Sequence, residues 1–217
     1  MFPIITAVTS SVRAPALPVE LNGVSVSVNG GAAGLYSVGD VEKQINFVVP
    51  IGTAPGLAGV VVNIASGATD TAIHGLTQVV PAQPDLFSST NDAGGTAVTA
   101  NITNPLNRIV TTTFSVTSPA DSGGTLAPTI VELNLTGVRL AIQSELTVTV
   151  GTTVISGDAI VLKKSNPEMP GFDIINFTLP ASLAGAGDVP IFVTFTRGSV
   201  GTTTSRNDSS APKIHIN

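Results

Sequence analysis

The sequence predicts an all-β protein that consists of two β-sandwich modules in tandem, joined by a β-hairpin linker. Short segments in which apolar and polar residues alternate occur throughout the chain, and no segment has a sustained helical period. Glycine, proline and asparagine residues separate these segments at short intervals, which is typical of β-sandwiches. A block of residues in the first half of the chain also recurs in the second half, which indicates two copies of one module.

The clearest strands contain branched aliphatic residues that alternate with serine or threonine, as in Val24–Val28 and Leu146–Val150. β-Branched side chains fit a pleated sheet and lose rotational freedom in a helix, so this composition favours strands. Turn residues follow both segments, with Asn29-Gly30 after the first and Gly151 after the second. Further strands are expected at residues 45–49, 60–64, 191–195 and 213–216.

The repeated block begins with Ile45-Asn-Phe-Val-Val-Pro50 and recurs as Ile175-Asn-Phe-Thr-Leu-Pro180. Each copy follows an alternating strand and precedes a glycine-bearing loop and a further strand. We therefore expect a first module at residues 1–88 and a second module at residues 118–217. The residues expected to form the core of the repeat are Ile45, Phe47, Pro50, Ile175, Phe177 and Pro180.

The residues between the two modules, 89–117, are expected to form the linking β-hairpin. Its strands are predicted at residues 96–102 and 108–117. The segment Asn104-Pro-Leu-Asn107 lies between them, and asparagine and proline both favour a turn.

The composition excludes several functional classes. The 217 residues carry a net charge of −5, so a broad basic surface for nucleic acid is not expected. The chain has no cysteine, which excludes a disulfide, a thiolate metal site and a thiol nucleophile. No run of about 20 apolar residues occurs, so we expect no transmembrane helix. Hydrophobic residues make up 42% of the chain, which predicts a folded protein rather than a disordered one.

Few residues are candidates for catalysis or metal binding. His74 and His215 are the only histidines, and neither has a histidine or carboxylate two or four residues after it. Glu168 and Asp173 lie in a long loop of the second module, but nothing in the sequence marks either as buried. Nucleophile-elbow and phosphate-loop motifs do not occur. The sequence therefore predicts no catalytic site, no metal site and no cofactor.

Further blocks flank the repeat and carry a resemblance to a known family. In the first module they are Leu17-Pro18, residues 21–30, residues 44–50, Gly52-Thr-Ala-Pro-Gly56 and Pro84-Asp-Leu-Phe87. In the second module they are residues 135–139, residues 170–180 and residues 182–187. In this order they resemble the uncharacterised C-terminal domain family of secreted acidobacterial proteins, over nearly the whole chain. The resemblance implies tandem immunoglobulin-like modules in an extracellular protein, and it implies no catalytic activity.

The first module differs from the second at its front end. In the second module, the apolar strand Ile130-Val-Glu-Leu-Asn-Leu-Thr-Gly137 precedes the alternating strand. Members of the family that the chain resembles usually carry a comparable strand in the first module as well. Here only residues 1–17 precede the corresponding region, so the resemblance implies that one strand is missing. The remaining candidate is an apolar N-terminal strand, which either folds onto its own sheet or enters the sheet of a neighbouring molecule. Its residues are Phe2, Ile4, Ile5, Ala7 and Val8.

These observations predict a non-enzymatic structural protein, secreted and located outside the cell or at the cell surface. We expect a homo-oligomer or homopolymer, specifically a filament whose subunits exchange the N-terminal strand. Only 11% of residues are charged, and strand edges with few charges do not resist pairing with a neighbour. The alternative is an adhesion module, or a carbohydrate- or protein-binding module, of a larger secreted protein, with a surface glycan or another protein as partner.

Overall fold

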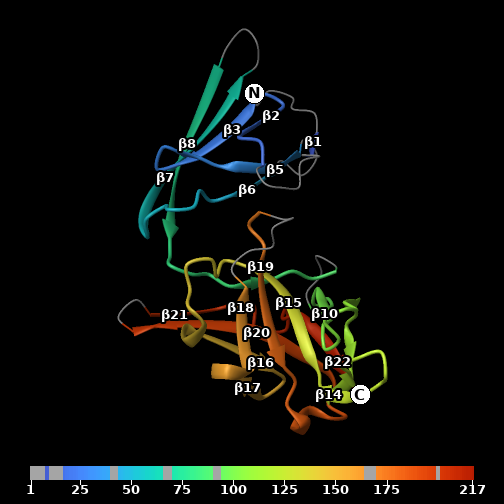
Figure 1. Ribbon diagram of the computed structural model, residues 1–217. Coiled ribbons are helices and arrows are strands. Elements are labelled where there is room, and N and C mark those ends of the chain that lie inside the picture. The colour runs from blue at the N-terminus through green and yellow to red at the C-terminus, as the bar shows by residue number, and fades with distance from the viewer. Residues whose placement is uncertain are drawn as a thin grey trace. The chain divides into compact units, whose positions relative to one another are not determined.

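The computed structural model describes residues 8–9, 17–39, 44–65, 70–89, 94–163, 170–198 and 201–217. These residues form several β-sheets, which confirms the predicted all-β class (Figure 1). The helical elements with described bounds are single 3₁₀ turns at Gln143–Glu145, Gly157–Ala159 and Ala181–Leu183. Within the described ranges, no helix has the length and apolar character needed to cross a membrane.

The chain divides into two compact units. Unit 1 comprises residues 1–81 together with 166–171, and unit 2 comprises residues 82–165 together with 172–217. The division falls at Pro81 and Ala82 rather than at residue 88, because residues 85–86 pair with a strand of unit 2.

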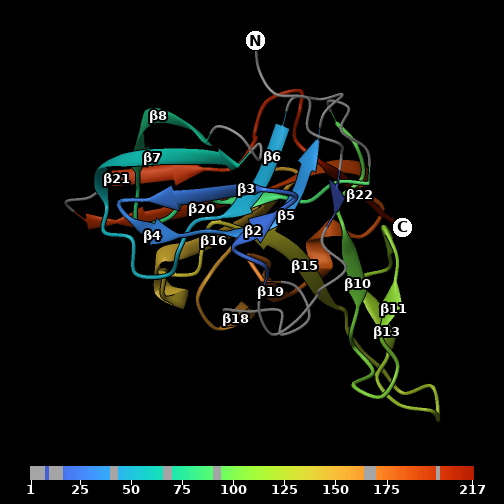
Figure 2. The same cartoon turned by 90° about the horizontal axis from the view of Figure 1, so that it is seen from above.

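Unit 1 consists of two antiparallel sheets. The first has the strand order β1-β5-β6, with β1 at Val8–Thr9, β5 at Gly34–Gly39 and β6 at Gln44–Val48. The second has the order β2-β3-β7-β8, and β4 pairs with β3. Figure 2 shows that β5 and β6 run across the direction of β3 and β7. The strands of this second sheet are β2 (Glu20–Leu21), β3 (Val24–Val28), β4 (Gly31–Ala32), β7 (Gly56–Ala65) and β8 (Asp70–Val79).

The alternation predicted for Val24–Val28 places its three valines in the core of unit 1. Val24, Val26 and Val28 are buried, and Val26 packs in one cluster with Leu35 of the opposite sheet. The predicted turn at Asn29-Gly30 is present, since both residues have positive φ angles of 48° and 80°. Two consecutive residues of positive φ are the signature of a type I′ hairpin, a conformation that asparagine and glycine tolerate.

Unit 2 also consists of two main sheets, which share one hydrophobic core. The first has the order β11-β10-β15-β19-β18, with β9 beside β15, and the second has the order β12-β22-β20-β16-β17, with β21 beside β20. A single cluster of buried residues contains Val131 and Leu133 of the first sheet and Val148 and Val193 of the second. The two sheets therefore pack face to face.

The strands of unit 2 have the following bounds. In the first sheet they are β9 (Asp85–Leu86), β10 (Thr99–Asn101), β11 (Ile109–Val110), β15 (Ile130–Thr136), β18 (Ile160–Lys163) and β19 (Asp173–Thr178). In the second sheet they are β12 (Thr113–Phe114), β16 (Leu146–Val150), β17 (Thr153–Ile155), β20 (Gly187–Arg197), β21 (Gly201–Thr204) and β22 (Lys213–Ile216). A separate hairpin consists of β13 (Thr117–Pro119) and β14 (Leu126–Pro128).

The segment predicted as a linking hairpin, residues 89–117, is part of unit 2. Its strands β10 and β11 do pair in antiparallel fashion, and the N–H of Asn107 donates to the carbonyl of Asn104 in the turn between them. However, β10 also pairs along its other edge with β15. This second pairing makes the hairpin an edge of the main sheet instead of a separate linker.

Candidate strand-acceptor site

The two units repeat the same local pattern of strands, and the comparison identifies an open edge in unit 1. In unit 2, β19 carries the second copy of the repeated block and pairs with β18 on one side and β15 on the other. In unit 1, β6 carries the first copy and pairs with β5. No strand among the described residues pairs with the other edge of β6. We call this edge, with the side chains below it, the acceptor slot.

The registers of the two units show which neighbour β6 lacks. Phe47 lies opposite Leu35 of β5, and its counterpart Phe177 lies opposite Ile160 of β18. On its other side, Phe177 lies opposite Val131 of β15. The open edge of β6 therefore corresponds to the edge of β19 that β15 occupies.

Backbone groups of β6 point into the slot. The N–H of Leu35 donates to the carbonyl of Pro18, not to β6, so Leu35 and Phe47 form a non-hydrogen-bonded pair. In a strand, the N–H and C=O of such a residue point toward the opposite edge, and the residue two positions away points the same way. The N–H and C=O groups of Phe47 and Ile45 thus face the slot and are available to a further strand.

Side chains below this edge are less buried than their counterparts in unit 2. Ile175 and Phe177 are 0% and 1% exposed, whereas Ile45 and Phe47 are only partly buried. The physical reason is that β15 contributes side chains to the core of unit 2, among them Val131, and no described strand of unit 1 takes this position. The predicted repeat core is therefore complete in one unit and partly open in the other.

The same difference extends to the facing sheet. In unit 1, Val60 and Val62 of β7 lie opposite Val28 and Val26 of β3. The equivalent residues of β20 in unit 2 are Ile191 and Val193, which lie opposite Val150 and Val148 of β16. The two residues of unit 2 are 0% exposed, and the two valines of unit 1 are partly buried. The valines belong to the cluster that contains Ile45 and Phe47 at its margin, so these four apolar side chains line the slot.

The outer face of β6, in contrast, is occupied by polar contacts and by another segment. The side chain of Asn46 donates to Ser37 Oγ at 2.9 Å and accepts from Gln44 Nε2 at 2.7 Å. A Cβ atom on Gly171 would lie 2.8 Å from Val48 Cγ2, so the backbone at Gly171 rests on this face. Since β6 contains no charged residue, an uncharged strand suits its open edge.

The two prolines of the repeat core lie just after the strands that they follow. Pro50 and Pro180 are both partly buried. Each comes two residues after the end of its strand, β6 or β19, where the missing proline N–H costs no ladder hydrogen bond.

Among the predicted donor residues, Phe2, Ile4, Ile5 and Ala7 lie outside the described residues. The backbone of Val8 pairs with Val38 as part of β1. In the sheet order β1-β5-β6, this pairing occupies the edge of β5 that faces away from the slot. The described part of the N-terminal segment is thus in the first sheet of unit 1 but not beside β6.

A second exposed apolar surface lies on the β7–β8 hairpin. Nearly all of β8 is exposed, and the strand forms one edge of its sheet. Leu57 and Leu76 are 68% and 73% exposed, and Leu76 lies opposite Gly59, two residues from Leu57 along β7. The strand β8 is not predicted from the sequence, because Asp70–Val79 shows little alternation of apolar and polar residues.

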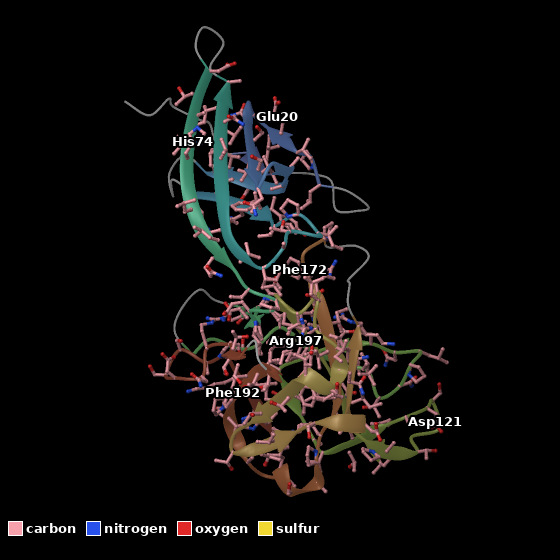
Figure 3. The ribbon with its side chains drawn as sticks, turned by 90° about the vertical axis from the view of Figure 1, so that its left-hand side faces the viewer. Glu20, His74, Asp121, Phe172, Phe192 and Arg197 are labelled. Carbon is pink, nitrogen blue, oxygen red and sulfur yellow. The ribbon has the colours of Figure 1, made fainter. Side chains whose placement is uncertain are left out.

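The two histidines, which are candidates for metal binding, belong to different units. Figure 3 shows His74 on β8, where it is exposed, and His215 lies in unit 2 with its Nδ1 2.7 Å from Asp188 Oδ1. Glu168 lies outside the described residues. Within the described ranges, no group of three or more histidine, aspartate or glutamate side chains is placed to hold a metal ion.

Asp173 is buried, although nothing in the sequence marked it so. Its side chain is 2% exposed and accepts a hydrogen bond from Arg139 Nε at 2.6 Å and from the Val138 N–H at 3.2 Å. Desolvation by burial raises the pKa of the Asp173 carboxyl above its usual 3.8, against the opposing effect of Arg139. This pair joins the start of β19 to the loop after β15, which is a structural role.

Comparisons with models of known protein families, with curated proteins and with solved structures find no match for this chain.

The sequence contains two separate signals for the acceptor slot. Ile45 and Phe47 are predicted core residues of the repeat, and the first module is separately expected to lack its first strand. The register of β15 and β19 connects the two signals, because the strand expected to be missing is the one that would lie beside the repeated block. Register between distant strands is not encoded in local periodicity, so the sequence alone did not connect them.

Proposed function

We propose that this chain is a non-enzymatic structural protein of the cell exterior or cell surface, in which two immunoglobulin-like sandwiches in tandem form one subunit of a homopolymer. Subunits associate when the N-terminal strand of one molecule adds to the first unit of the next. The single observation that carries the proposal is the open edge of β6, at the position that β15 fills in unit 2.

Strand addition suits this edge for two physical reasons. The N–H and C=O groups of Ile45 and Phe47 supply main-chain hydrogen bonds, and each such bond contributes about 1 kcal/mol net. The partly buried apolar side chains below the edge offer further stabilisation, of roughly 1.5–3 kcal/mol for each large apolar side chain that becomes fully buried. Main-chain pairing supplies affinity, and the alternate side chains supply selectivity.

The geometry of such a contact allows an open chain of subunits. Donor and acceptor are different surfaces, so the contact is heterologous, and a heterologous contact produces a ring or a filament. The surface carries few charges, with 11% charged residues in the chain, so electrostatic repulsion opposes this packing only weakly.

Deletion of residues 1–7 tests the proposal. We expect the full chain to form particles larger than a monomer in analytical ultracentrifugation and filaments in negative-stain electron micrographs. The truncated chain should remain monomeric, and a synthetic peptide of residues 1–9 should bind it, whereas a peptide of the same composition in scrambled order should not.

Two results would contradict the proposal. A truncated chain that assembles as the full chain does would show that the N-terminal segment is not the donor. A full chain that stays monomeric at all concentrations, yet binds to a glycan array, would favour the carbohydrate-binding alternative instead.

A further inference from the structure

We infer that the donor strand comes from a second copy of the chain and lies antiparallel to β6, with Phe2 and Ile4 facing the core and Pro3 at the outer edge. The inference rests on the proposed function, and it specifies which molecule supplies the donor strand and the register in which that strand pairs with β6. It follows from the position of β1, the chemistry of proline and the register of β15 in unit 2.

The position of β1 excludes the molecule's own N-terminal segment. In the register that we infer, Ile4 lies opposite Ile45, which lies opposite Val38, which lies opposite Val8. Ile4 and Val8 would then be three strand spacings apart, about 14 Å in a straight line through β5 and β6.

The chain between these two positions is too short. The four residue steps from Ile4 to Val8 span at most about 14 Å when fully extended. This length equals the straight line through two occupied strands, and every real path over or under the sheet is longer. While Val8 and Thr9 pair with β5, an N-terminal strand that places Ile4 in the slot must therefore belong to another molecule.

Proline fixes which side chains of the donor face inward. In β15, the backbone groups of the outward-facing residues bond to the segment that contains β10. The Asn134 N–H donates to the carbonyl of Val98, and the Ile130 carbonyl accepts from the N–H of Ile102. The backbone groups of the inward-facing residues therefore point toward β19. A donor strand in the same arrangement bonds to β6 through its inward residues. Proline has no N–H, so Pro3 costs no ladder bond only at an outward position.

An outward Pro3 places Phe2 and Ile4 inward, and the register of β15 then sets their partners. In unit 2, Val131 lies opposite Phe177 and Leu133 lies opposite Ile175. The equivalent donor places Phe2 opposite Phe47 and Ile4 opposite Ile45. A shift of two residues that places Ile4 opposite Phe47 would place the hydroxyl of Thr6 opposite Ile45, whereas the inferred register sets an apolar side chain opposite both positions.

The absence of cysteine from the chain makes the register measurable by disulfide formation. In this register, Ile5 and Gln44 form an outward, non-hydrogen-bonded pair, whose Cα atoms lie about 4.5 Å apart. This separation falls in the range of about 4.4–6.8 Å that a disulfide requires. Pro3 stays in place, and Gln44 is exposed, so neither substitution disturbs the core.

The experiment mixes two full-length variants, Ile5→Cys and Gln44→Cys, under mild oxidation. We expect the mixture to form a disulfide-linked species of twice the chain mass that neither variant forms alone, and the double variant to form a ladder of covalent multimers. The matched control mixes Ile4→Cys with Gln44→Cys. These two side chains would face opposite sides of the sheet, so the linked species should be lost.

Each departure from this result overturns a specific part of the inference. A double variant that forms only an intramolecular disulfide would overturn the second copy as donor. A linked species from the Ile4→Cys mixture, and not from the Ile5→Cys mixture, would overturn the assignment of Ile4 as an inward residue and Ile5 as an outward residue. Ultracentrifugation of the same samples after reduction separates the two proposals. If the chains assemble but neither mixture forms a disulfide, only the inferred register is overturned. If the chains do not assemble, the proposed function is overturned as well.

Discussion

Replacement of each phenylalanine of the repeat by alanine tests whether unit 1 is an incomplete sandwich. Phe47 and Phe177 occupy equivalent positions in β6 and β19. Phe177 is 1% exposed within the core of unit 2, whereas Phe47 is partly buried at the margin of its cluster. The two substitutions remove the same atoms, so the difference between their effects reports the difference in packing.

The expected magnitudes follow from burial. Truncation of a fully buried phenylalanine to alanine costs about 3–5 kcal/mol in the free energy of unfolding, which we expect for Phe177→Ala. Part of the Phe47 surface remains in water, so we expect Phe47→Ala to cost roughly half as much, about 2 kcal/mol. In assembled material the cost at Phe47 should rise, because the donor strand removes the remaining surface from water.

Tyrosine fluorescence reports on the unfolding of unit 1. Tyr36 is the only tyrosine, the chain has no tryptophan, and Tyr36 lies in β5 of unit 1. Urea unfolding of the full chain, at a concentration where it is monomeric, should be followed by Tyr36 fluorescence for Phe47→Ala and by far-ultraviolet circular dichroism for both variants. The control is Leu35→Ala, since Leu35 is 0% exposed in unit 1 and should cost about 2–5 kcal/mol.

One result would refute the reasoning. If Phe47→Ala destabilises the monomer as much as Phe177→Ala does, Phe47 must be fully covered in the unassembled molecule. The edge of β6 would then not be open, and the acceptor slot would not exist.

Two further predictions concern unit 2. Gly137→Ala should destabilise it by several kcal/mol in urea unfolding, since a Cβ there would lie 1.8 Å from the Gln83 carbonyl oxygen at a φ of +80°. Gly124→Ala, with a similar φ of +81° and open space around it, should cost only about 1–2 kcal/mol, and equal costs would argue against the close contact. The raised pKa of Asp173 means that its carboxyl group binds a proton more tightly in the folded state than in the unfolded state. Protonated Asp173 therefore contributes its full stabilisation below the usual pKa of 3.8, and this stabilisation is lost as the pH rises through the pKa of the folded state. The unfolding free energy of the wild type should therefore fall relative to Asp173→Asn as the pH rises from the acid range to neutrality, and a difference that does not change with pH would contradict the raised pKa.

Local features of the sequence predicted the strands well where alternation was strong. Val24–Val28 and Leu146–Val150 form β3 and β16 with the predicted bounds, and the predicted Asn29-Gly30 turn is present. Such features depend on neighbouring residues only, because side-chain direction alternates along a strand and specific residues tolerate positive φ. The strand β8 lacks this alternation, since almost all of its residues are exposed, and it was not predicted.

The boundary of the units and the place of the hairpin depended on contacts between distant residues. The pairing of β9 and β10 with β15 draws residues 85–86 and 99–101 into unit 2, and nothing in those segments specifies β15 as their partner. Pairing partners are chosen by the global packing of apolar faces, which a single segment does not determine.

The sequence by itself determined the all-β class and the repeated block, and it predicted that the first half of the chain lacks one strand. Only the tertiary structure placed the expected gap, since the repeated block borders β15 in one unit and, among the described residues, has no strand at the equivalent edge in the other. The physical reason is that a strand's alternation sets which side chains face the core. The neighbour that supplies its hydrogen bonds, however, can come from anywhere in the chain or from another molecule.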